Sequence, residues 1–417
     1  MSSMSMLCAS RFAHFIRLAS RNIFRQRLRT AVTLLAIAFG VAGIILSGGF
    51  VQDMFTQLAE AIIHSQSGHI QVAQAGFFTK GSQSPQRYVI DSPRPEELFI
   101  NNVPGVVESM SRVYFFGLLN NRKTDLPILA EGIEPDREAV LGTYLRIQEG
   151  RQLEDKDHYG ILLGQGVAHA LKLRPGEAAT LVASTTEGAM NTLDFEVVGV
   201  FQSFSQEYDS RAVKIPLSAA QELLSSSGVN VLVVALRRTP DTEKVARILR
   251  RHAVGADLEV RTWEELNDFY QGAVAFYDRE FGVLRLVILI MVLLGVANAV
   301  NMSAFERVGE FGTMRALGNR GRDISALVLT EGLLTGLIGA TLGTALGMAI
   351  AIGASSIGIP MPPPPNSNLG YIARIPIVAS VVVGAFFVGL GATVLASIVP
   401  AIRVSRIPVA TALRENA

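Results

Sequence analysis

The side chains of this chain that could carry out a reaction form none of the common catalytic patterns. Its six histidines make no H-E-x-x-H zinc motif, and no serine stands in G-x-S-x-G. No G-x-x-x-x-G-K-[ST] loop is present to hold nucleotide phosphates, and Gly164-Gln165-Gly166 lacks the third glycine of a dinucleotide motif. A single cysteine excludes a Cys cluster and an internal disulfide. We therefore expect no catalytic residue, no metal site and no cofactor on this chain.

The polar pattern that stands out is a short segment between two apolar runs, FERVGEFGTMRALGNRGRDI from Phe305 to Ile324. We expect a short helix here that ends at Gly318. Such a helix would carry polar residues on one face and apolar residues on another, namely Glu306, Glu310 and Thr313 against Met314 and Leu317. Glu310 could pair with a partner, or it could only cap its own helix.

Four uncharged runs surround this segment and predict transmembrane helices at 30–52, 286–305, 324–359 and 375–402. The first, Thr30–Gln52, would reach about 35 Å as a helix, enough to cross a hydrocarbon core of about 30 Å. A charge in mid-bilayer costs about 2.5–3.5 kcal/mol, so uncharged runs of this length are typical of spans. The uncharged runs themselves, of which the third is Gly332–Ala373, hold no ionisable residue, and this argues against coupling to protons or ions.

Arginines near the span ends predict the orientation. They gather before the first span, between spans two and three, and after span four, whereas the loop 360–374 contains only Arg374. We expect 1–29, 306–323 and 403–417 on the cytoplasmic side and 53–285 outside. Residues 1–29 read as an amphipathic interfacial helix or as a basic topology signal, and the two readings are compatible. The formal net charge of +1 gives no footprint for nucleic acid.

Segment 53–285 has an ordinary soluble composition and alternates short strands with helices, which predicts an α+β domain. A β-rich insertion is expected near 150–205. Apolar residues at helical spacing predict that spans one and two continue out of the bilayer as stalks. The aromatic residues of these stalks either pack together or line a lipid-accessible groove, with Met54, Phe55, Phe276 and Tyr277 as candidates.

Glycines recur every three to four positions on the third span, at Gly332, Gly336, Gly339, Gly343 and Gly347. Small residues at this spacing allow helices to approach closely in lipid. They predict either packing within one subunit or a seam between two copies.

Three motifs at matching topological positions resemble the FtsX-like/MacB-like ABC transporter permeases. Before span one stand Arg21-Asn22-Ile23 and Arg27-Leu28-Arg29-Thr30. Between spans two and three, Glu310-Phe311-Gly312 and Met314-Arg315-Ala316-Leu317-Gly318 are similar to the family's E-I-G-x-x-R-A-L-G. After span four, Pro400-Ala401-x-Arg403, Pro408 and Ala412-Leu413-Arg414 are similar to its closing motif. The resemblance covers essentially the whole chain.

The resemblance implies a periplasmic domain with a porter-like part and a β-rich insertion. It also implies a separate ABC ATPase in two copies, which holds ATP and Mg²⁺ and docks at the segment between spans two and three. The residues that this carries to the contact are Glu306, Arg307, Glu310, Met314, Arg315, Leu317 and Gly318. Movement driven by ATP would pass along the stalks to the periplasmic domain, and a second permease copy or a paralogue would complete the complex.

The layout as a separate permease is most similar to the lipoprotein-releasing (LolC/LolE-type) permeases of the bacterial inner membrane. That implies lipoproteins or lipids as cargo and a periplasmic carrier that receives them, although the loop at Pro360–Pro376 departs from their pattern. Two alternatives stay open. The chain could power a tripartite pump for drugs or peptides, or it could regulate cell-wall hydrolases, for which segment 53–285 is large.

Overall fold

The computed structural model describes residues 19, 25, 27–81, 84–141, 145–363 and 370–409. Most of the predicted amphipathic helix in 1–29 and much of segment 403–417 lie outside these residues. The chain divides into two compact units. The helical unit comprises Met1–Phe55, Val274–Ile359 and Ile372–Ala417, and the sheet unit comprises Thr56–Ala273 and Pro360–Tyr371.

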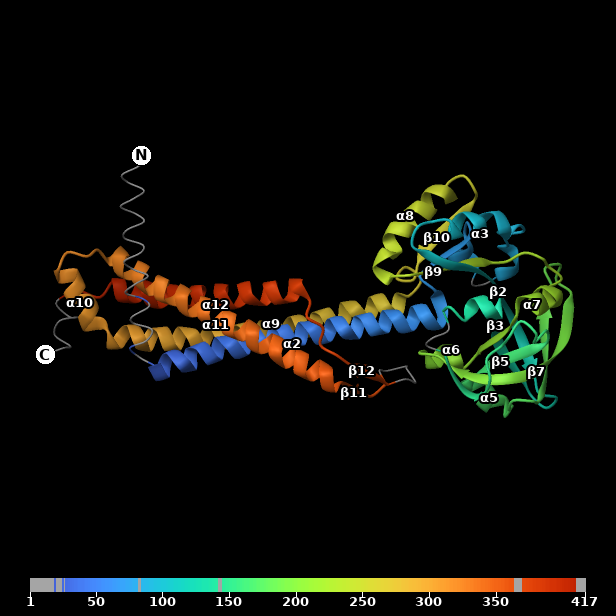
Figure 1. Ribbon diagram of the computed structural model, residues 1–417, viewed down its shortest axis with the longest axis horizontal. Coiled ribbons are helices and arrows are strands. Elements are labelled where there is room, and N and C mark those ends of the chain that lie inside the picture. The colour runs from blue at the N-terminus through green and yellow to red at the C-terminus, as the bar shows by residue number, and fades with distance from the viewer. Residues whose placement is uncertain are drawn as a thin grey trace. The chain divides into compact units, whose positions relative to one another are not determined.

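Among the described residues, four helices are long and apolar enough to cross a membrane: α2 (Arg27–Ile62), α9 (Asp268–Glu306), α11 (Gly321–Ile357) and α12 (Ala379–Ser405). Each contains or largely overlaps one of the predicted spans. Helices α2 and α9 both run without a break beyond the spans predicted for them, at 30–52 and 286–305 (Figure 1).

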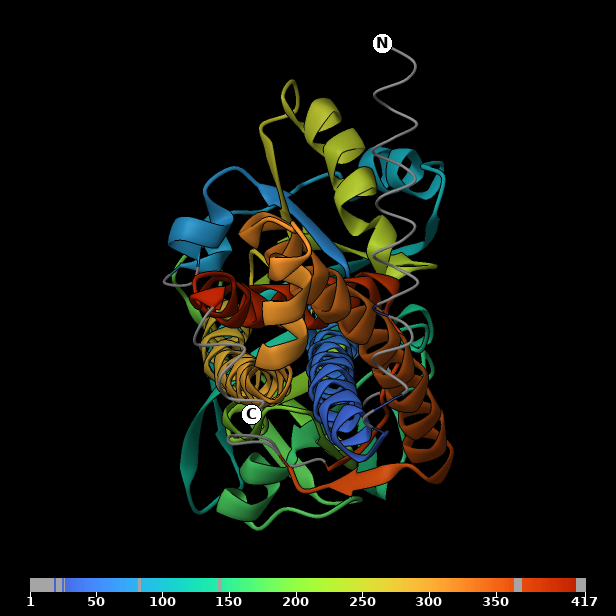
Figure 2. The same ribbon diagram turned by 90° about the vertical axis from the view of Figure 1, so that its left-hand side faces the viewer.

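The core of the helical unit is built from branched residues on two helices and small residues on the other two. Buried Ile37, Val41 and Ile45 of α2 meet Val292 and Val296 of α9. Small side chains of α11 and α12 complete this cluster, with Ala340, Ala385, Ala392 and Ala396. Figures 1 and 2 show α11 and α12 crossing at an angle, and the two helices contact each other. Close packing of small against branched side chains replaces the hydrophobic drive that lipid cannot supply.

The glycine stripe of α11 is occupied inside the chain. A Cβ on Gly332 or Gly336 would lie 2.2 Å or 2.9 Å from the nearest side-chain atom of α12, on Ser397 and Thr393 respectively. Further along, a Cβ on Gly343 would lie 2.7 Å from the carbonyl oxygen of Ala38 in α2. These glycines therefore let α11 pack against α12 and α2, which is the first of the two readings of the stripe.

Three short elements lie between the long helices. Helix α10 (Val308–Ala316) lies between α9 and α11, in the segment predicted to be a short helix. Strands β11 (Ile359–Met361) and β12 (Tyr371–Ala373) form a two-stranded sheet within the predicted loop 360–374. Residues 364–369, which include the end of the proline run, lie outside the described residues.

The sheet unit contains ten strands that belong to one hydrogen-bonded sheet. In chain order they are β1 (Ile70–Gln74), β2 (Val106–Asn120), β3 (Asp125–Ile133), β4 (Arg146–Gly150), β5 (Gly160–Gly164), β6 (Ala178–Ser184), β7 (Met190–Gln202), β8 (Ala212–Pro216), β9 (Val231–Leu236) and β10 (Leu258–Thr262). The helices between them are α3 (Pro93–Asn101), α4 (Pro135–Glu138), α5 (Gln165–Leu171), α6 (Gln206–Asp209), α7 (Leu217–Leu224) and α8 (Thr242–Ala253). Strands β4 and β8 and helices α3 and α6 occupy segments for which no element was predicted.

The ten strands form two parts that share β2. The first part has the order β10-β1-β9-β2 and is antiparallel throughout. In the second part, β2, β3, β8, β5, β7 and β6 pair in succession, and β6 returns to β2, so that six strands close on themselves. Strand β4 pairs with β7 outside this ring. Strands β4 to β7 correspond to the predicted β-rich insertion near 150–205.

Fully apolar strands lie at the centre of each part. Every residue of β5 and of β9 is buried, as their continuous apolar sequences GILLG and VLVVAL require. Helix α8 covers its part with one face, which contributes Val245, Ala246 and Leu249 to the core.

Within the sheet unit, the last turns of α2 and the first turn of α9 pack together around Trp263. Ala59 and Ile62 of α2 and Ile63 lie against the indole, and its ring centroid is 4.6 Å from that of Tyr270. Helix α2 continues as a π-helical segment, η1 (Ile63–Ser67), which leads directly into β1. The two predicted stalk helices are therefore joined by a common apolar contact at this end.

Candidate functional site

Helix α10 is defined by a break on each side. Helix α9 ends at Glu306, and Arg307 leaves the helical conformation with φ −108° and ψ 15° before α10 begins at Val308. At the other end Gly318 adopts φ +100°, a conformation that glycine takes without strain. The main-chain N–H of Gly318 donates to the carbonyl of Arg315, and that of Asn319 donates to Met314. The expectation that Glu306 shares one helix with Glu310 and Thr313 is wrong, because the break at Arg307 places Glu306 on α9.

Arg307 sits at this break and ties three elements together. Its Nε donates to Glu310 at 3.0 Å, and its Nη1 donates to both carboxylate oxygens of Glu331 at 2.9 Å. Its guanidinium carbon lies 5.1 Å from the ring centroid of Phe311. Separating a largely buried ion pair would leave a charge away from water with no opposite charge beside it, so these contacts hold the side chains in a fixed arrangement.

Glu331 was missed by the sequence analysis. It lies inside the predicted third span, 324–359. That span was treated as uncharged because the uncharged run on which it was based begins at Gly332, one residue after Glu331. Its side chain is largely buried against Arg307. The signal that could have found it is the presence of an acidic residue within a predicted span, since such residues are typically paired.

Two arginines, Arg25 before α2 and Arg29 in the first turn of α2, extend the network. Arg25 donates to Glu310 at 2.7 Å, and Arg29 donates to Glu306 at 2.7 Å. Burial alone would raise the pKa of Glu310, but hydrogen bonds and charge from Arg307 and Arg25 hold the pKa of this carboxyl below its usual value. From the sequence these arginines were assigned to topology and to the motif before span one, so their pairing with α9 and α10 was not anticipated.

A cavity of about 300 Å³ lies beside this network in the helical unit. It is lined by the ion-paired residues and by apolar side chains such as Val296, Val300 and Val328. A water takes about 30 Å³ in the liquid, so the cavity has room for on the order of ten waters around the charged groups. Hydration of this kind allows six charged side chains to lie beside the apolar core of the bundle.

The residues expected to contact an ATPase separate into an outer and an inner group. Leu317 is 82% exposed, and Gly318 beside it is also exposed. Met314 is instead half-buried and packs against the chain's own cluster of Phe311, Ile324, Leu327 and others, so the two apolar residues predicted to contact the ATPase lie in different surroundings. The guanidinium of Arg315 donates to the main-chain carbonyls of Ser405 and Ile407, which braces α10 against the end of α12.

The four residues of the predicted groove all belong to the helical unit. The ring centroids of Phe55 on α2 and Tyr277 on α9 lie 6.5 Å apart, and those of Phe276 and Tyr277 lie 5.5 Å apart. Phe276 is 63% exposed, whereas Met54 and Phe55 are half-buried. The structure thus brings Phe55 and Tyr277 together and leaves Phe276 on the surface.

The described part of the chain thus combines four helices long and apolar enough to cross a membrane, a short ion-paired helix between two of them and an α+β domain, which is the layout of a multi-pass membrane protein. The model of the MacB-like periplasmic core domain matches residues 30–252, and that of the FtsX-like permease C-terminal region matches residues 282–409. The chain belongs to this family of FtsX-like/MacB-like ABC transporter permeases, and its α+β domain is periplasmic or extracellular.

Curated relatives agree with this assignment. An uncharacterized ABC transporter permease of Methanocaldococcus jannaschii is 24% identical over 344 residues, which are 81% of this chain and 83% of that protein. The uncharacterized ABC transporter permease YvrN of Bacillus subtilis is 25% identical and covers 96% of this chain and 98% of its own length. A macrolide export ATP-binding/permease protein MacB of Rhodospirillum rubrum is 24% identical over 86% of this chain but only 56% of its own length.

Among solved structures, the chain is similar to the periplasmic region of MacB from Actinobacillus actinomycetemcomitans. The two share 14% identity over 50% of this chain and 95% of that one, with a TM-score of 0.36. The extracellular domain of YknZ, an ABC-type transporter from Gram-positive bacteria, is 15% identical over 46% of this chain and 99% of its own, with a TM-score of 0.33.

Proposed function

We propose that this permease subunit works by mechanotransmission, driven by a separate ABC ATPase that binds two copies of the permease or one copy and a paralogue. The observation that carries the proposal is the form of α10. Its exposed apolar tip at Leu317 stands on a base fixed by the ion pairs of Arg307 and by the brace of Arg315. A partner that pushes on this tip would move α9, α10 and α11 together.

The stalk helices supply the second part of the proposal. Because α2 and α9 are unbroken from the predicted spans into the sheet unit, a displacement along either axis would be transmitted by its hydrogen-bonded backbone. The arginine distribution supports a bacterial inner-membrane location with both termini and α10 on the cytoplasmic side. ATP and Mg²⁺ would be held by the partner.

Site-specific photocrosslinking tests the docking surface. A benzoylphenylalanine placed at Leu317 should capture the ATPase in cells, while the same group at Met314, which faces the chain's own cluster, should not. The captured band is identified by mass spectrometry. Equal capture at both positions, or capture of no ATPase at Leu317, would contradict the assignment of this tip.

For the cargo, we propose lipoproteins or lipids that leave the membrane beside Met54, Phe55, Phe276 and Tyr277 and pass to a periplasmic carrier. The exposed aromatic surface of Phe276 beside a half-buried pair supports an amphiphilic ligand. The macrolide-export relatives favour a second candidate, a permease of a tripartite pump for drugs or peptides. Regulation of cell-wall hydrolases is the third.

Crosslinking at Phe276 separates the first two candidates, and Phe387 on α12 provides a matched control because both side chains are 63% exposed. Lipoprotein adducts at Phe276 alone would support the first candidate. Adducts with an added macrolide or peptide at Phe276 alone would support the second. Identical adducts at the two positions would remove the groove from the proposal.

A further inference from the structure

Strand β2 changes partners in its middle, and Arg112 lies at the change. Residues Val106–Arg112 pair with β9, and residues Val113–Asn120 pair with β3. Asn230 directly precedes β9, and its side-chain oxygen accepts the main-chain N–H of Tyr114 while its own main-chain N–H donates to the carbonyl of Arg112. This point of β2 is therefore where the four-stranded part of the sheet meets the closed six-stranded part.

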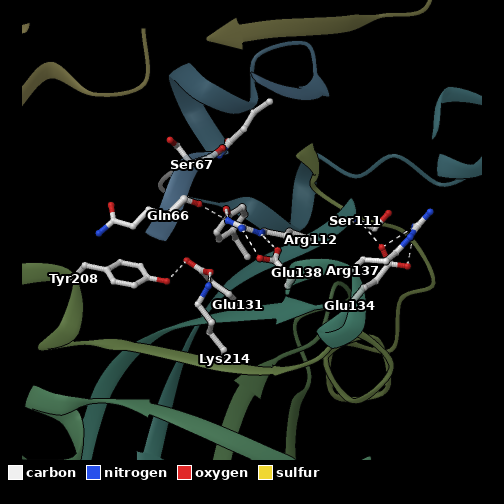
Figure 3. A network of polar contacts seen from close by, with 12 residues as sticks. Gln66, Ser67, Ser111, Arg112, Glu131, Glu134, Arg137, Glu138, Tyr208 and Lys214 are labelled. Atoms are coloured by element: carbon white, nitrogen blue, oxygen red, sulfur yellow. Dashed lines mark hydrogen bonds and ion pairs between the residues drawn. The ribbon is translucent and has the colours of Figure 1, made fainter. Parts of the chain in front are cut away.

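The side chain of Arg112 is buried and contacts both the end of the α2 stalk and α4 (Figure 3). Its Nη1 donates to the main-chain carbonyl of Gln66, which belongs to the π-helical segment η1 that continues α2. Its Nε and Nη2 donate to the two oxygens of Glu138, the second at 2.8 Å. Burial alone would raise the pKa of Glu138, but the charges of Arg112 and Lys214 hold the pKa of this carboxyl below its usual value.

A second buried pair continues the network into the six-stranded part. Lys214 of β8 lies 3.2 Å from Glu131 of β3, and the hydroxyl of Tyr208 donates to the same carboxylate at 2.7 Å. Burial, together with the Glu131 charge, raises the pKa of Tyr208, so this phenol remains a donor. Figure 3 shows Glu131 and Lys214 on the side of the network away from Ser111 and Arg137.

The stalk end is also held closely against the other part of the sheet. Gly68, with φ +64°, directly follows η1, and a Cβ there would lie 2.3 Å from a side-chain carbon of Val233 in β9. Apolar residues of similar volume can stabilise a core as well as a buried ion pair does. The Arg112 pair is thus more informative about position than about stability, because its planar fork fixes three elements at one point.

We propose that Arg112 is the joint through which displacement of the α2 stalk changes the angle between the two parts of the external domain. Arg112 is a positioning residue in this role, and the proposal rests on the mechanotransmitting function proposed above. Pulling on the Gln66 carbonyl would load the guanidinium, and the bidentate contact with Glu138 would pass that load to α4 and β3.

The test uses the full-length permease in nanodiscs with the ATPase that co-purifies with it. Cys8 is the only cysteine, so Cys8→Ser provides a background for spin labels at Glu187, in the turn between β6 and β7, and at Lys244 on α8. Pulsed electron paramagnetic resonance then measures the distance between the two parts without nucleotide and with ATP trapped in a hydrolysis-deficient ATPase. The parent should show a nucleotide-dependent change in this distance.

Arg112→Lys keeps a positive charge beside Glu138 but lacks the fork that reaches Gln66 as well. Arg112→Met/Glu138→Leu removes both charges together, which avoids leaving one of them buried alone. Both variants should lose more than half of the change while binding the ATPase normally. Arg137→Lys is the matched control, because Arg137 pairs with Glu97, Glu108 and Glu134, and it should keep the full change.

The outcomes separate the joint from the function on which it rests. A full parental change in both Arg112 variants would overturn the joint and leave the proposed function intact. No change on ATP trapping in the parent would overturn mechanotransmission and the joint with it. Loss of the buried-tryptophan emission of Trp263 in both Arg112 variants would assign Arg112 to folding alone and would also overturn the proposal.

Discussion

Truncating Leu317 and Met314 separately should have opposite consequences, although the two residues lie only three positions apart. Leu317→Ala removes an apolar side chain that is 82% exposed and is available to a partner. Met314→Ala removes a half-buried side chain from the cluster of Phe311, Ile324 and Leu327. We expect the first to weaken ATPase binding with little change in stability, and the second to destabilise the permease with little change in binding.

The magnitudes follow from burial. Covering a leucine side chain fully is worth about 1.5–3 kcal/mol, so losing most of it at a contact should cost roughly 2 kcal/mol. That corresponds to an increase in Kd of about 30-fold. A fully buried methionine truncated to alanine costs about 2–5 kcal/mol, and half-burial reduces this to roughly 1–2 kcal/mol for Met314.

The Kd is measured by biolayer interferometry, with the permease immobilised in nanodiscs and the ATPase in solution. Stability is followed by thermal loss of the helical circular dichroism signal of the same samples. Leu342, a half-exposed leucine of α11 far along the chain from α10, provides a Leu→Ala control that should change neither quantity strongly.

Two results would refute this reasoning. If Leu317→Ala binds the ATPase with the parental Kd, the exposed tip of α10 is not the docking surface. If Met314→Ala weakens binding as much as Leu317→Ala and leaves stability unchanged, the inward orientation of Met314 is not the one present in the complex.

Three further outcomes are expected. Gly343→Ala would place a Cβ 2.7 Å from a main-chain oxygen of α2, so it should lower the free energy of unfolding by about 1–3 kcal/mol, measured by thermal unfolding. Gly353 lies on the same helix, and a Cβ there would meet nothing within 4 Å. Gly353→Ala should therefore be neutral or stabilising by up to about 1 kcal/mol. Burial, with a neighbouring histidine, lowers the pKa of His69 to about 4. The unfolded chain therefore takes up a proton at this histidine below about pH 6.5, whereas the folded chain does so only near pH 4. The stability of the external domain should be full above about pH 6.5 and fall by at most about 3 kcal/mol toward pH 4. Trp263 fluorescence follows this stability, and His69→Gln should make it depend less on pH. Glu331→Ala should destabilise the helical unit by about 2 kcal/mol. This is less than for an ion pair without access to water, because the adjoining cavity can hydrate the charge left on Arg307. An unchanged melting temperature in nanodiscs would show that the Arg307–Glu331 pair does not hold α10.

Several features were determined by the sequence because they depend on neighbouring residues alone. The absence of charged residues over Thr30–Gln52 predicts a membrane span whatever the rest of the chain does. Each charged side chain in lipid raises the free energy of insertion separately, so the segment's own composition decides whether it can span. Continuous apolar runs such as Gly160–Gly164 are buried strands in the structure. Gly318 predicted the end of α10, and it adopts the positive φ that such an end requires.

Much of the candidate site could not be predicted. The periodicity of apolar residues indicates which face of a helix or strand is apolar, but it does not indicate which distant element packs against that face. Arg307 and Glu331 are 24 positions apart, and Arg25 and Glu310 are 285 apart, so no local period connects them. Met314 and Leu317 look equivalent in the sequence, and only the packing of α10 against α11 and α12 turns one inward and the other outward.

The same limit applies to the sheet. Alternation and apolar runs indicated most of the strands, but hydrogen bonds between strands carry almost no sequence code, so the closure of β6 onto β2 was not visible. Nor was the exchange of partners at Arg112, which reads in the sequence as one more residue in a strand. The sequence by itself determined the spans, the α+β class and the position of the short helix. Tertiary structure alone decided which charges meet, because burial makes a charge find a partner but does not specify from which part of the chain that partner comes.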